Sequence, residues 1–325
     1  MKLLKLVPDD TNIRFLRWRV PFYVISLLLM AASLTLVFTK GLNLGVDFVG
    51  GQMIRTTFTQ SATAPVAELR EQIGALGFGE PIIQQFGNPN EISIRMRLPD
   101  GATADPGLSD AMARKITATL KAGHADVRID GVDSVSGKVS GELFRTGMTA
   151  LLAAMAAISI YIWIRFEWQF GIGALFALAH DVTLTLGMFA LTQMEFDLNI
   201  VAALLTLMGY SLNDTIVVYD RIRENLRKYR RMPLPELLDL SVNETLSRTI
   251  VTSSSVLITL LALLLFGPNV IFGFTAAITL GIFVGTYSSI YMASPILIWL
   301  KVTGSSFVPT DTAVDRQEAA ARARG

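Results

Sequence analysis

Long uncharged apolar runs recur along the chain and predict six membrane-spanning helices. About twenty apolar residues in a helix are enough to cross the hydrocarbon core of a bilayer. The first run follows basic residues, but it is too long for a signal-peptide core and no small-residue cleavage site follows it, so we expect an uncleaved span. The last run is long enough to tilt, and Pro295 is placed to kink it. The expected spans are Val20–Thr39, Thr146–Ile164, Phe170–Leu191, Leu198–Tyr219, Thr249–Phe266 and Ile271–Leu300.

Lysine and arginine are distributed unevenly among the segments that join these spans. They are frequent in residues 1–19, in the segment after the fourth span and in residues 301–325. The short segments between spans three and four, and between spans five and six, carry none. Because basic residues accumulate in cytoplasmic segments, we expect residues 1–19 and 301–325 to be cytoplasmic and residues 40–145 to lie on the periplasmic side.

Residues 40–145 are long enough to form a domain, and their pattern changes from apolar runs to short periodic elements. Ile92, Ile94, Met96 and Leu98 alternate with polar residues, as in a half-buried strand. The expected order of strand, helix, strand, strand, helix and strand is typical of a ferredoxin-like fold. The expected elements are strand 52–59, helix 65–76, strands 81–86 and 91–98, helix 108–120 and strand 125–135. The fold class is thus an α-helical polytopic membrane protein with six transmembrane helices and a small α+β periplasmic domain.

Small side chains recur every fourth residue in two of the spans and predict close helix packing. Such spacing lets a second helix approach closely within the bilayer. We therefore expect both helices to contact protein rather than lipid. The residues are Gly273, Ala277, Gly281, Gly285, Ser289 and Ala293 in the last span, and Gly173, Ala177, Asp181 and Thr185 in the third.

The amino-acid composition limits the kinds of chemical site that the chain can form. The chain has no cysteine and only two histidines, so we expect no disulfide, no thiolate metal site and no histidine-built metal site. No arrangement of nucleophile and base stands out, and we expect no enzyme activity, no cofactor and no nucleic-acid partner. The net charge of +1 is uninformative, because the charges are sorted between segments.

Two acidic residues lie inside predicted spans, where a charge costs a few kcal/mol and usually has a function. Asp181 is near the middle of the third span, beside His180, and Asp214 follows Asn213 in the fourth. Helical offsets place Tyr210, Ser211, Val217 and Arg221 on the face of Asp214. We expect the fifth span to open with Arg248, whose face continues through Thr252, Ser255 and Thr259.

Two interpretations of these residues remain open. In the first they form a proton path, because a carboxylate in a low dielectric binds a proton readily and a nearby arginine opposes binding. Asp214 would then titrate, with Arg248 as its electrostatic partner and Asp181 as a second site. In the second they are structural, with buried Asp–Arg or Asp–Thr contacts joining the helices. Arg248 would then extend to the interface, and His180 would bond a neighbouring helix.

Two further motifs flank the spans. Gly45–Gly51 is rich in glycine but lacks the Gly-Lys-Ser/Thr of a phosphate loop, so we expect a tight junction in which Asp47 is a turn or capping residue. Asp220–Asn225 continues the fourth span. Its residues Asp220, Arg221 and Arg223 fit either a charged helix end at the interface or a docking and gating element.

Five motifs together resemble the SecF family of protein-export membrane proteins, a branch of the SecD/SecF family in the RND superfamily. They occur in the family's order, and the resemblance covers about residues 17–300. The motifs are Gly45–Gly51, Ala179–Val182, Gly209–Val218, Asp220–Asn225 and Glu244–Thr249.

The resemblance implies an RND-type half of six helices in a bacterial inner membrane, with SecD supplying the other six. It implies that the proton gradient drives late translocation of exported unfolded preproteins through the SecYEG channel. It makes Asp214 and Arg248 the leading proton-path residues, supports Asp181 as a second polar site, and likens the outer domain to the family's smaller one. Two alternatives remain: an RND-type half that exports lipid or small molecules, and a purely structural subunit without an ion path. By resemblance, a drug exporter would carry twelve spans and two large outer domains in one chain.

Overall fold

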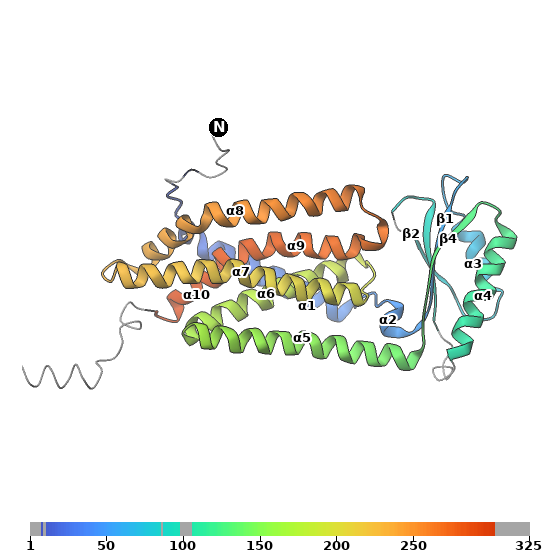
Figure 1. The fold of residues 1–325 in the computed structure, drawn as a ribbon, viewed down its shortest axis with the longest axis horizontal. Helices are drawn as coiled ribbons and strands as arrows, with labels where there is room; N and C mark the ends of the chain where they lie inside the picture. Colours follow the sequence, from blue (N-terminus) through green and yellow to red (C-terminus); the bar gives the residue numbers. More distant parts are fainter. Residues whose placement is uncertain (1–7, 9–10, 86, 98–105, 303–325) are drawn as a thin grey trace, which may run out of the picture.

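A bundle of long helices carries a small α/β domain at one end (Figure 1). The computed structural model describes residues 8, 11–85, 87–97 and 106–302. Within this part of the chain, six helices are long and apolar enough to cross a membrane. The expected fold class is therefore confirmed. The expected tail beyond Val302, most of the N-terminal basic segment and the ends of two strands, at Phe86 and Leu98, lie outside the described residues.

Three helices form the centre of the bundle. Half of the most apolar stretch of α6 and of α7 is buried, against 11% of that of α5. The last span packs against both α6 and α7. The spans are α1 (Arg19–Thr39, preceded by η1, Phe15–Trp18), α5 (Gly137–Arg165), α6 (Trp168–Thr192), α7 (Leu198–Lys228), α8 (Leu234–Phe266) and α9 (Phe272–Ser288, preceded by η2, Asn269–Ile271) with its continuation.

Several helices extend beyond the apolar runs that predicted them. α5 begins at Gly137, because Ser136 caps it through a hydrogen bond from the Val139 N–H at 3.4 Å. α8 begins at Leu234, and its polar first half is stabilised from the N-terminal segment, where the Leu16 N–H donates to Asp239 at 2.9 Å. Arg248 is thus inside α8 rather than at its start. A hydropathy window cannot detect a helix that continues beyond the apolar run.

The last span changes its winding before Pro295. α9 passes into a π-helical turn, η3 (Ser289–Ala293), and then into α10 (Ser294–Trp299). Proline has no N–H to donate, and a π-helical turn shifts the hydrogen-bond register. The Tyr23 hydroxyl donates to the Met292 carbonyl at 2.7 Å, and the Tyr219 hydroxyl to the Ala293 carbonyl at 3.0 Å. Tyrosines from α1 and α7 therefore stabilise the irregular turn.

The outer domain has the expected ferredoxin-like topology. Its antiparallel sheet has the order β2-β3-β1-β4, so each β-α-β unit is split by a strand of the other. The helices cover the face turned away from the bundle (Figure 1). The hydrophobic core of the domain lies between the sheet and these helices. It includes Ile54 of β1 and Ile94 of β3, which are paired across the two strands. The elements are β1 (Gly51–Phe58), α3 (Val66–Gly74), β2 (Ile82–Gln85), β3 (Glu91–Met96), α4 (Pro106–Gly123) and β4 (Val127–Val135).

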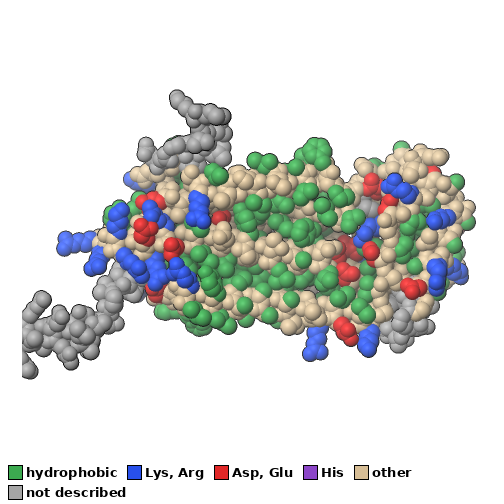
Figure 2. Space-filling model, in the orientation of Figure 1, with side chains coloured by type: hydrophobic (Ala, Val, Ile, Leu, Met, Phe, Trp, Pro, Cys, Tyr) green, Lys and Arg blue, Asp and Glu red, His purple; other side chains and the backbone are tan. Residues whose placement is uncertain are grey.

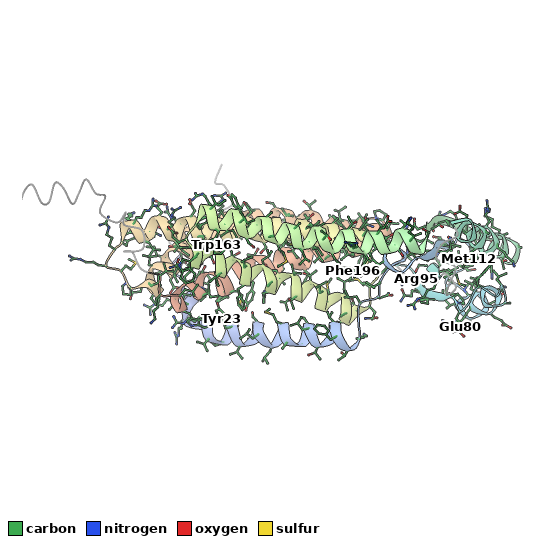
Figure 3. The ribbon with its side chains drawn as sticks, turned by 90° about the horizontal axis from the view of Figure 1, so that it is seen from below. Tyr23, Glu80, Arg95, Met112, Trp163 and Phe196 are labelled. Carbon is green, nitrogen blue, oxygen red and sulfur yellow. The ribbon has the colours of Figure 1, made fainter. Side chains whose placement is uncertain are left out.

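The opposite face of the sheet meets the bundle. Arg95 of β3 is buried there, and its guanidinium donates to the Leu44 carbonyl at 2.7 Å and to Asn43 Oδ1 at 3.0 Å. The segment around Leu44 in turn forms a parallel bridge with Phe196, between α6 and α7. Figure 3 shows Arg95 and Phe196 on the two sides of this junction. The domain is thus anchored to the bundle by its sheet as well as by its two chain connections.

Candidate functional site

Asp181 is a fully buried carboxylate at the contact between three spans. Its Oδ2 accepts hydrogen bonds from Ser211 of α7 at 2.5 Å and from Ser288 of α9 at 2.9 Å. Thr185, one turn further along α6, donates to the Asp181 carbonyl at 2.8 Å. The side chain therefore joins α6, α7 and α9 through hydroxyl donors.

His180 completes this first cluster. Its Nδ1 lies 2.9 Å from Asp181 Oδ1, and the ring is fully buried. Its Nε2 has no hydrogen-bond partner among the described residues. The ring lies 6.1 Å from that of Tyr287, whose hydroxyl is 2.8 Å from Ser26 of α1. His180 and Asp181 thus form a pair of fully buried, neighbouring polar groups on α6.

Asp214 forms a second cluster, between α7, α8 and α9. It is 3% exposed, and Ser253 of α8 donates to its Oδ2 in a long contact of 3.4 Å. Ser253 Oγ is 2.8 Å from Thr286 Oγ1 of α9, and the Tyr210 hydroxyl reaches Ser253 at 3.4 Å. This carboxylate thus lies next to hydroxyl groups of α8 and α9, and it forms no ion pair of 4 Å or less within the described part of the chain.

The two clusters lie on different sides of α7. The helical offset from Asp214 predicted that Ser211 shares its face, but the Ser211 hydroxyl instead bonds Asp181. α9 approaches α7 closely at this level, because a Cβ on Gly285 would lie 3.1 Å from that of Ser211. The hydrogen bonds of the described residues do not connect Asp181 with Asp214.

Arg248 projects away from the bundle. It is exposed on α8, together with Thr252, Ser255 and Thr259. No ion pair of 4 Å or less joins it to Asp214 within the described part of the chain, although its charge is near enough to act on that carboxylate. The structure thus brings Asp214 and Arg248 to neighbouring helices without pairing them.

α7 also presents a small and polar face to the outside. Asn213 is exposed, and so are the residues one, two and three turns before it: Gly209, Thr206 and Ala202. A Cβ on Gly209 would meet no atom within 4 Å. Side chains that face lipid are normally large and apolar. This small and polar face is therefore typical of a contact with another protein.

The small residues of the last span face α7. A Cβ on Gly281 would overlap the Leu207 side chain, and one on Gly273 would lie 3.4 Å from Ile200.

The outer end of α7 is capped twice, since Asp197 accepts from the Ile200 N–H at 3.1 Å and Asp47 from the Leu198 N–H at 3.0 Å.

Asp47 lies in α2 (Val46–Val49), the short helix within the glycine-rich junction. This helix ends at Gly50, whose φ of 72° favours glycine. The junction after the first span is therefore attached directly to the fourth.

Ion pairs connect three helices at the opposite end of the bundle. Asp220 pairs with Arg165 of α5 at 3.1 Å, and Arg221 with Glu244 of α8 at 2.8 Å. Arg223 lies 3.7 Å from Glu167, just before α6. The motif from Asp220 thus links α7 to α5, to α8 and to the residue before α6.

Sequence reasoning missed the hydroxyl partners of both carboxylates. Ser253, Thr286 and Ser288 are ordinary small residues in apolar runs, and the pattern on α8 pointed to Thr252 and Ser255 instead. The depth at which a serine meets a carboxylate of another helix depends on how the helices are rotated, which periodicity does not give. Within the described residues no group of three or more His, Asp or Glu could hold a metal ion.

Known proteins resemble this chain along most of its length. The family model described as protein export membrane protein SecD/SecF, C-terminal, matches residues 115–303, and the SecD/SecF GG motif matches residues 35–62. A protein translocase subunit SecF of Cereibacter sphaeroides is 47% identical, over 92% of this chain and 93% of that protein. That of Vibrio alginolyticus is 40% identical, over 94% and 96%.

Solved structures agree with this likeness. The crystal structure of SecDF, a translocon-associated membrane protein from Thermus, is similar with a TM-score of 0.82 and 35% identity, covering 91% of this chain. SecDF in a super-membrane-facing form gives a TM-score of 0.66 at 34% identity, covering 97%. In both comparisons the chain spans 40% of the SecDF chain.

Proposed function

The chain belongs to the SecD/SecF family of protein-export membrane proteins, and from this premise we propose that it acts with SecD to use the proton gradient for protein export. In this proposal it lies in a bacterial inner membrane and assists the SecYEG channel with unfolded preproteins. The observation that carries the proposal is Asp214, a buried carboxylate with hydroxyl neighbours beside an outward polar face.

The outward face supports a partner within the membrane. Asn213 on α7 and Arg248 on α8 would be costly against lipid tails, and the small Gly209 beside Asn213 would let another helix approach closely. The SecDF chains to which this chain is similar are much longer than it, which leaves room in them for a SecD part. A SecD bundle against α7 and α8 would remove these groups from lipid.

The same face provides a means of coupling. Arg248 is near Asp214 but not bound to it, and its long side chain can move as α8 or a partner moves. A positive charge that approaches Asp214 favours its ionised form, and withdrawal of that charge favours proton uptake. Movement of α8 against α7 would thus load and release a proton. We propose no chemical reaction on a substrate, so the subunit is a transport component rather than an enzyme.

Charge distribution supports the orientation. Lysine and arginine gather at the end of the bundle far from the outer domain (Figure 2). They include Arg221, Arg223, Arg227 and Lys228. By the positive-inside rule this end is cytoplasmic, with both termini, and residues 40–145 are periplasmic.

Proton-gradient-dependent translocation by reconstituted vesicles tests the proposal. Vesicles containing this chain, SecD and the translocation channel should lose the stimulation by the proton gradient when Asp214→Asn is introduced. Asp130→Asn is the matched control, because it makes the same change at an exposed ion pair in the outer domain. Co-purification with SecD checks assembly. If an assembled Asp214→Asn protein keeps full stimulation, Asp214 does not carry protons.

One observation favours a structural role for the other carboxylate. Asp181 already accepts bonds from Ser211, Ser288 and His180, and it joins three helices. A subunit in which both carboxylates served only to hold helices together would show reduced stability, but unchanged proton dependence, in both Asp→Asn variants. The vesicle experiment therefore also separates the transport role from the purely structural one.

A further inference from the structure

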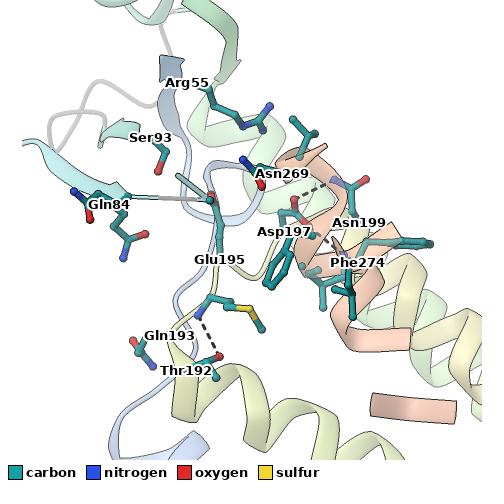
Figure 4. A pocket seen from close by; sticks show the side chains of 18 residues that line it. Arg55, Gln84, Ser93, Thr192, Gln193, Glu195, Asp197, Asn199, Asn269 and Phe274 are labelled. Atoms are coloured by element: carbon teal, nitrogen blue, oxygen red, sulfur yellow. Dashed lines mark hydrogen bonds between the residues drawn. The ribbon is translucent and has the colours of Figure 1, made fainter. Parts of the chain in front are cut away.

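A cavity of about 810 Å³ lies between the outer domain and the outer ends of the spans (Figure 4). Its upper wall is the bundle-facing side of the sheet, with Arg55 of β1 and Gln84 of β2. Its lower wall is formed by the end of α6, the loop into α7 and the start of α9. The two carboxylate clusters lie deeper in the bundle, and their residues do not line the cavity.

The cavity lies at the depth of lipid headgroups on this side of the membrane. Its lower wall contains Thr192 at the end of α6, Leu264 near the end of α8 and Phe274 in the first turn of α9. Helix ends of this kind mark the edge of the hydrocarbon core. Beyond Leu264 the surface continues into Leu265, 75% exposed, and Phe266, 87% exposed. Exposed apolar side chains thus directly follow the wall residue Leu264 in the chain.

Two carboxylates, Glu195 and Asp197, face the cavity. Glu195 Oε1 is buried and has no hydrogen-bond partner among the described residues, and it forms a long ion pair with Arg95 at 3.6 Å. Asp197 is fixed by Asn199 Nδ2, at 3.0 Å, and by its capping bond. Burial raises the pKa of both Glu195 and Asp197; the charge of Asp197 raises the pKa of Glu195 further, and the charge of Asp47 does the same for Asp197. An ammonium group would supply the hydrogen bond that Glu195 Oε1 lacks, and a counter-charge for Asp197, which forms no ion pair with another described residue.

The opposite wall presents a cation. The Arg55 guanidinium lies 2.8 Å from Asp133, and its side chain is 21% exposed. It borders the cavity together with Glu195 and Asp197. A guanidinium has five N–H donors in a planar fork, so Arg55 can keep its contact with Asp133 and still bind a phosphate oxygen. Negative, positive and apolar groups thus occur in one cavity.

We propose that this cavity binds the headgroup of a phospholipid that carries a primary ammonium beside its phosphodiester. The ammonium contacts Glu195 and Asp197, the phosphodiester faces Arg55, and the acyl chains follow the apolar wall at Leu264 and Phe274. This arrangement favours a phospholipid with a primary ammonium over phospholipids with other headgroups. A glycerol headgroup has no charge for the carboxylates, and a trimethylammonium has no N–H to donate to Glu195 Oε1.

Lipid retention measured by native mass spectrometry tests the proposal. The purified full chain in detergent is titrated with phosphatidylethanolamine, phosphatidylglycerol and phosphatidylcholine of the same acyl chains. We expect phosphatidylethanolamine to bind about tenfold or more tightly than the other two, since one charged hydrogen bond is worth about 1.5–3 kcal/mol. Equal retention of the three lipids would mean that any lipid there is only part of the annulus, and would overturn the proposal.

Variants localise the effect. Glu195→Gln should remove the preference for phosphatidylethanolamine, and Arg55→Gln should weaken phosphatidylethanolamine and phosphatidylglycerol alike. Glu80→Gln, an exposed position in the outer domain, is the matched control and should change neither. Thermal melting checks that each variant is folded. An unchanged lipid preference in folded Glu195→Gln would contradict the proposal.

Soluble competitors separate the lipid from other amines. Glycerophosphoethanolamine lacks acyl chains and should compete only weakly with the lipid. A lysine-rich unfolded peptide should not displace it. If the peptide displaces the lipid, or if the soluble headgroup binds as tightly as the lipid, the cavity is not a phospholipid site. None of these results depends on proton-driven export, so this proposal can fail while the proposed function stands.

Discussion

The Ser211 hydroxyl donates a 2.5 Å hydrogen bond to Asp181, across the contact between the third and fourth spans. Ser211 lies one turn before Asp214 in α7, yet it belongs to the other carboxylate. The fourth span therefore contributes to two polar clusters, one facing α6 and one facing α8. A rotation or shift of α7 changes the surroundings of both carboxylates at once.

Removing this hydroxyl should destabilise the bundle. We expect Ser211→Ala to lower the free energy of unfolding by about 0.6–1.7 kcal/mol, the range found for hydrogen bonds between membrane helices. Thermal melting in detergent provides the measurement. Asp181→Asn combined with Ser211→Ala should cost less than the sum of the single variants, because both disrupt one contact. Thr206→Ala, on the outward face of α7, is the control; an equal loss there would show that the effect is not specific to the buried bond.

Arg248 provides a test of electrostatic coupling. Arg248→Gln should remove most of the proton-gradient dependence of translocation, because the charge that acts on Asp214 is lost. Arg248→Lys keeps the charge but not the planar guanidinium, so partial activity is expected. Thr252→Val, on the same outward face one turn along α8, controls for disturbance of a partner contact. Full stimulation in an assembled Arg248→Gln complex would exclude Arg248 from the coupling.

Two glycines offer a matched pair for the packing of α7 and α9. A Cβ on Gly281 overlaps Leu207, whereas a Cβ on Gly209 meets open space. Gly281→Ala should therefore lower the melting temperature, with a cost of about 1–3 kcal/mol for overpacking. Gly209→Ala in the isolated subunit should be neutral or stabilising by up to about 1 kcal/mol, because alanine is the better helix former. Equal melting temperatures for the two variants would mean that the close packing of α9 on α7 does not contribute to stability.

Stability should depend on pH through Glu195. Burial raises its pKa above the ordinary value of 4.5, against the opposing charges of Arg95 and Arg55 and together with Asp197 and Asp47. The folded state then holds a proton that the unfolded state has released. Stability from this group is complete below about pH 4.5 and is lost as the pH rises through the folded-state pKa. As the pH rises through this window, the melting temperature of the wild type should fall relative to that of the Glu195→Gln variant. Parallel melting curves for the two proteins would show that Glu195 does not titrate there.

Much of the fold follows from local patterns in the sequence. Each span contains a long apolar run, and the alternation at Ile92 and Ile94 identifies a strand, although the contact with the bundle buries Ser93 and Arg95 on its other face as well. Asp181 and Asp214 stand out because charge is rare in such runs. These features depend on residues close together in the chain, and so they can be predicted from the sequence.

Other features depend on how distant segments meet. Ser253 and Thr286 were not expected beside Asp214, because no periodicity sets the rotation of one helix against another. The start of α8 at Leu234 depends on contacts with the N-terminal segment. The cavity joins Arg55, Glu195 and Phe274 from three separate parts of the chain. None of these could be deduced without the tertiary arrangement.

The connection between the outer domain and the second span has a mechanical consequence. β4 ends at Val135 and α5 begins at Gly137, so Ser136 alone separates them, and its side chain is bonded into the first turn of the helix. A connection of one residue is too short for the sheet to rotate independently of α5. In the proposed function, a force on the sheet would therefore pass directly to α5, and a tilt of α5 would pass back to the sheet.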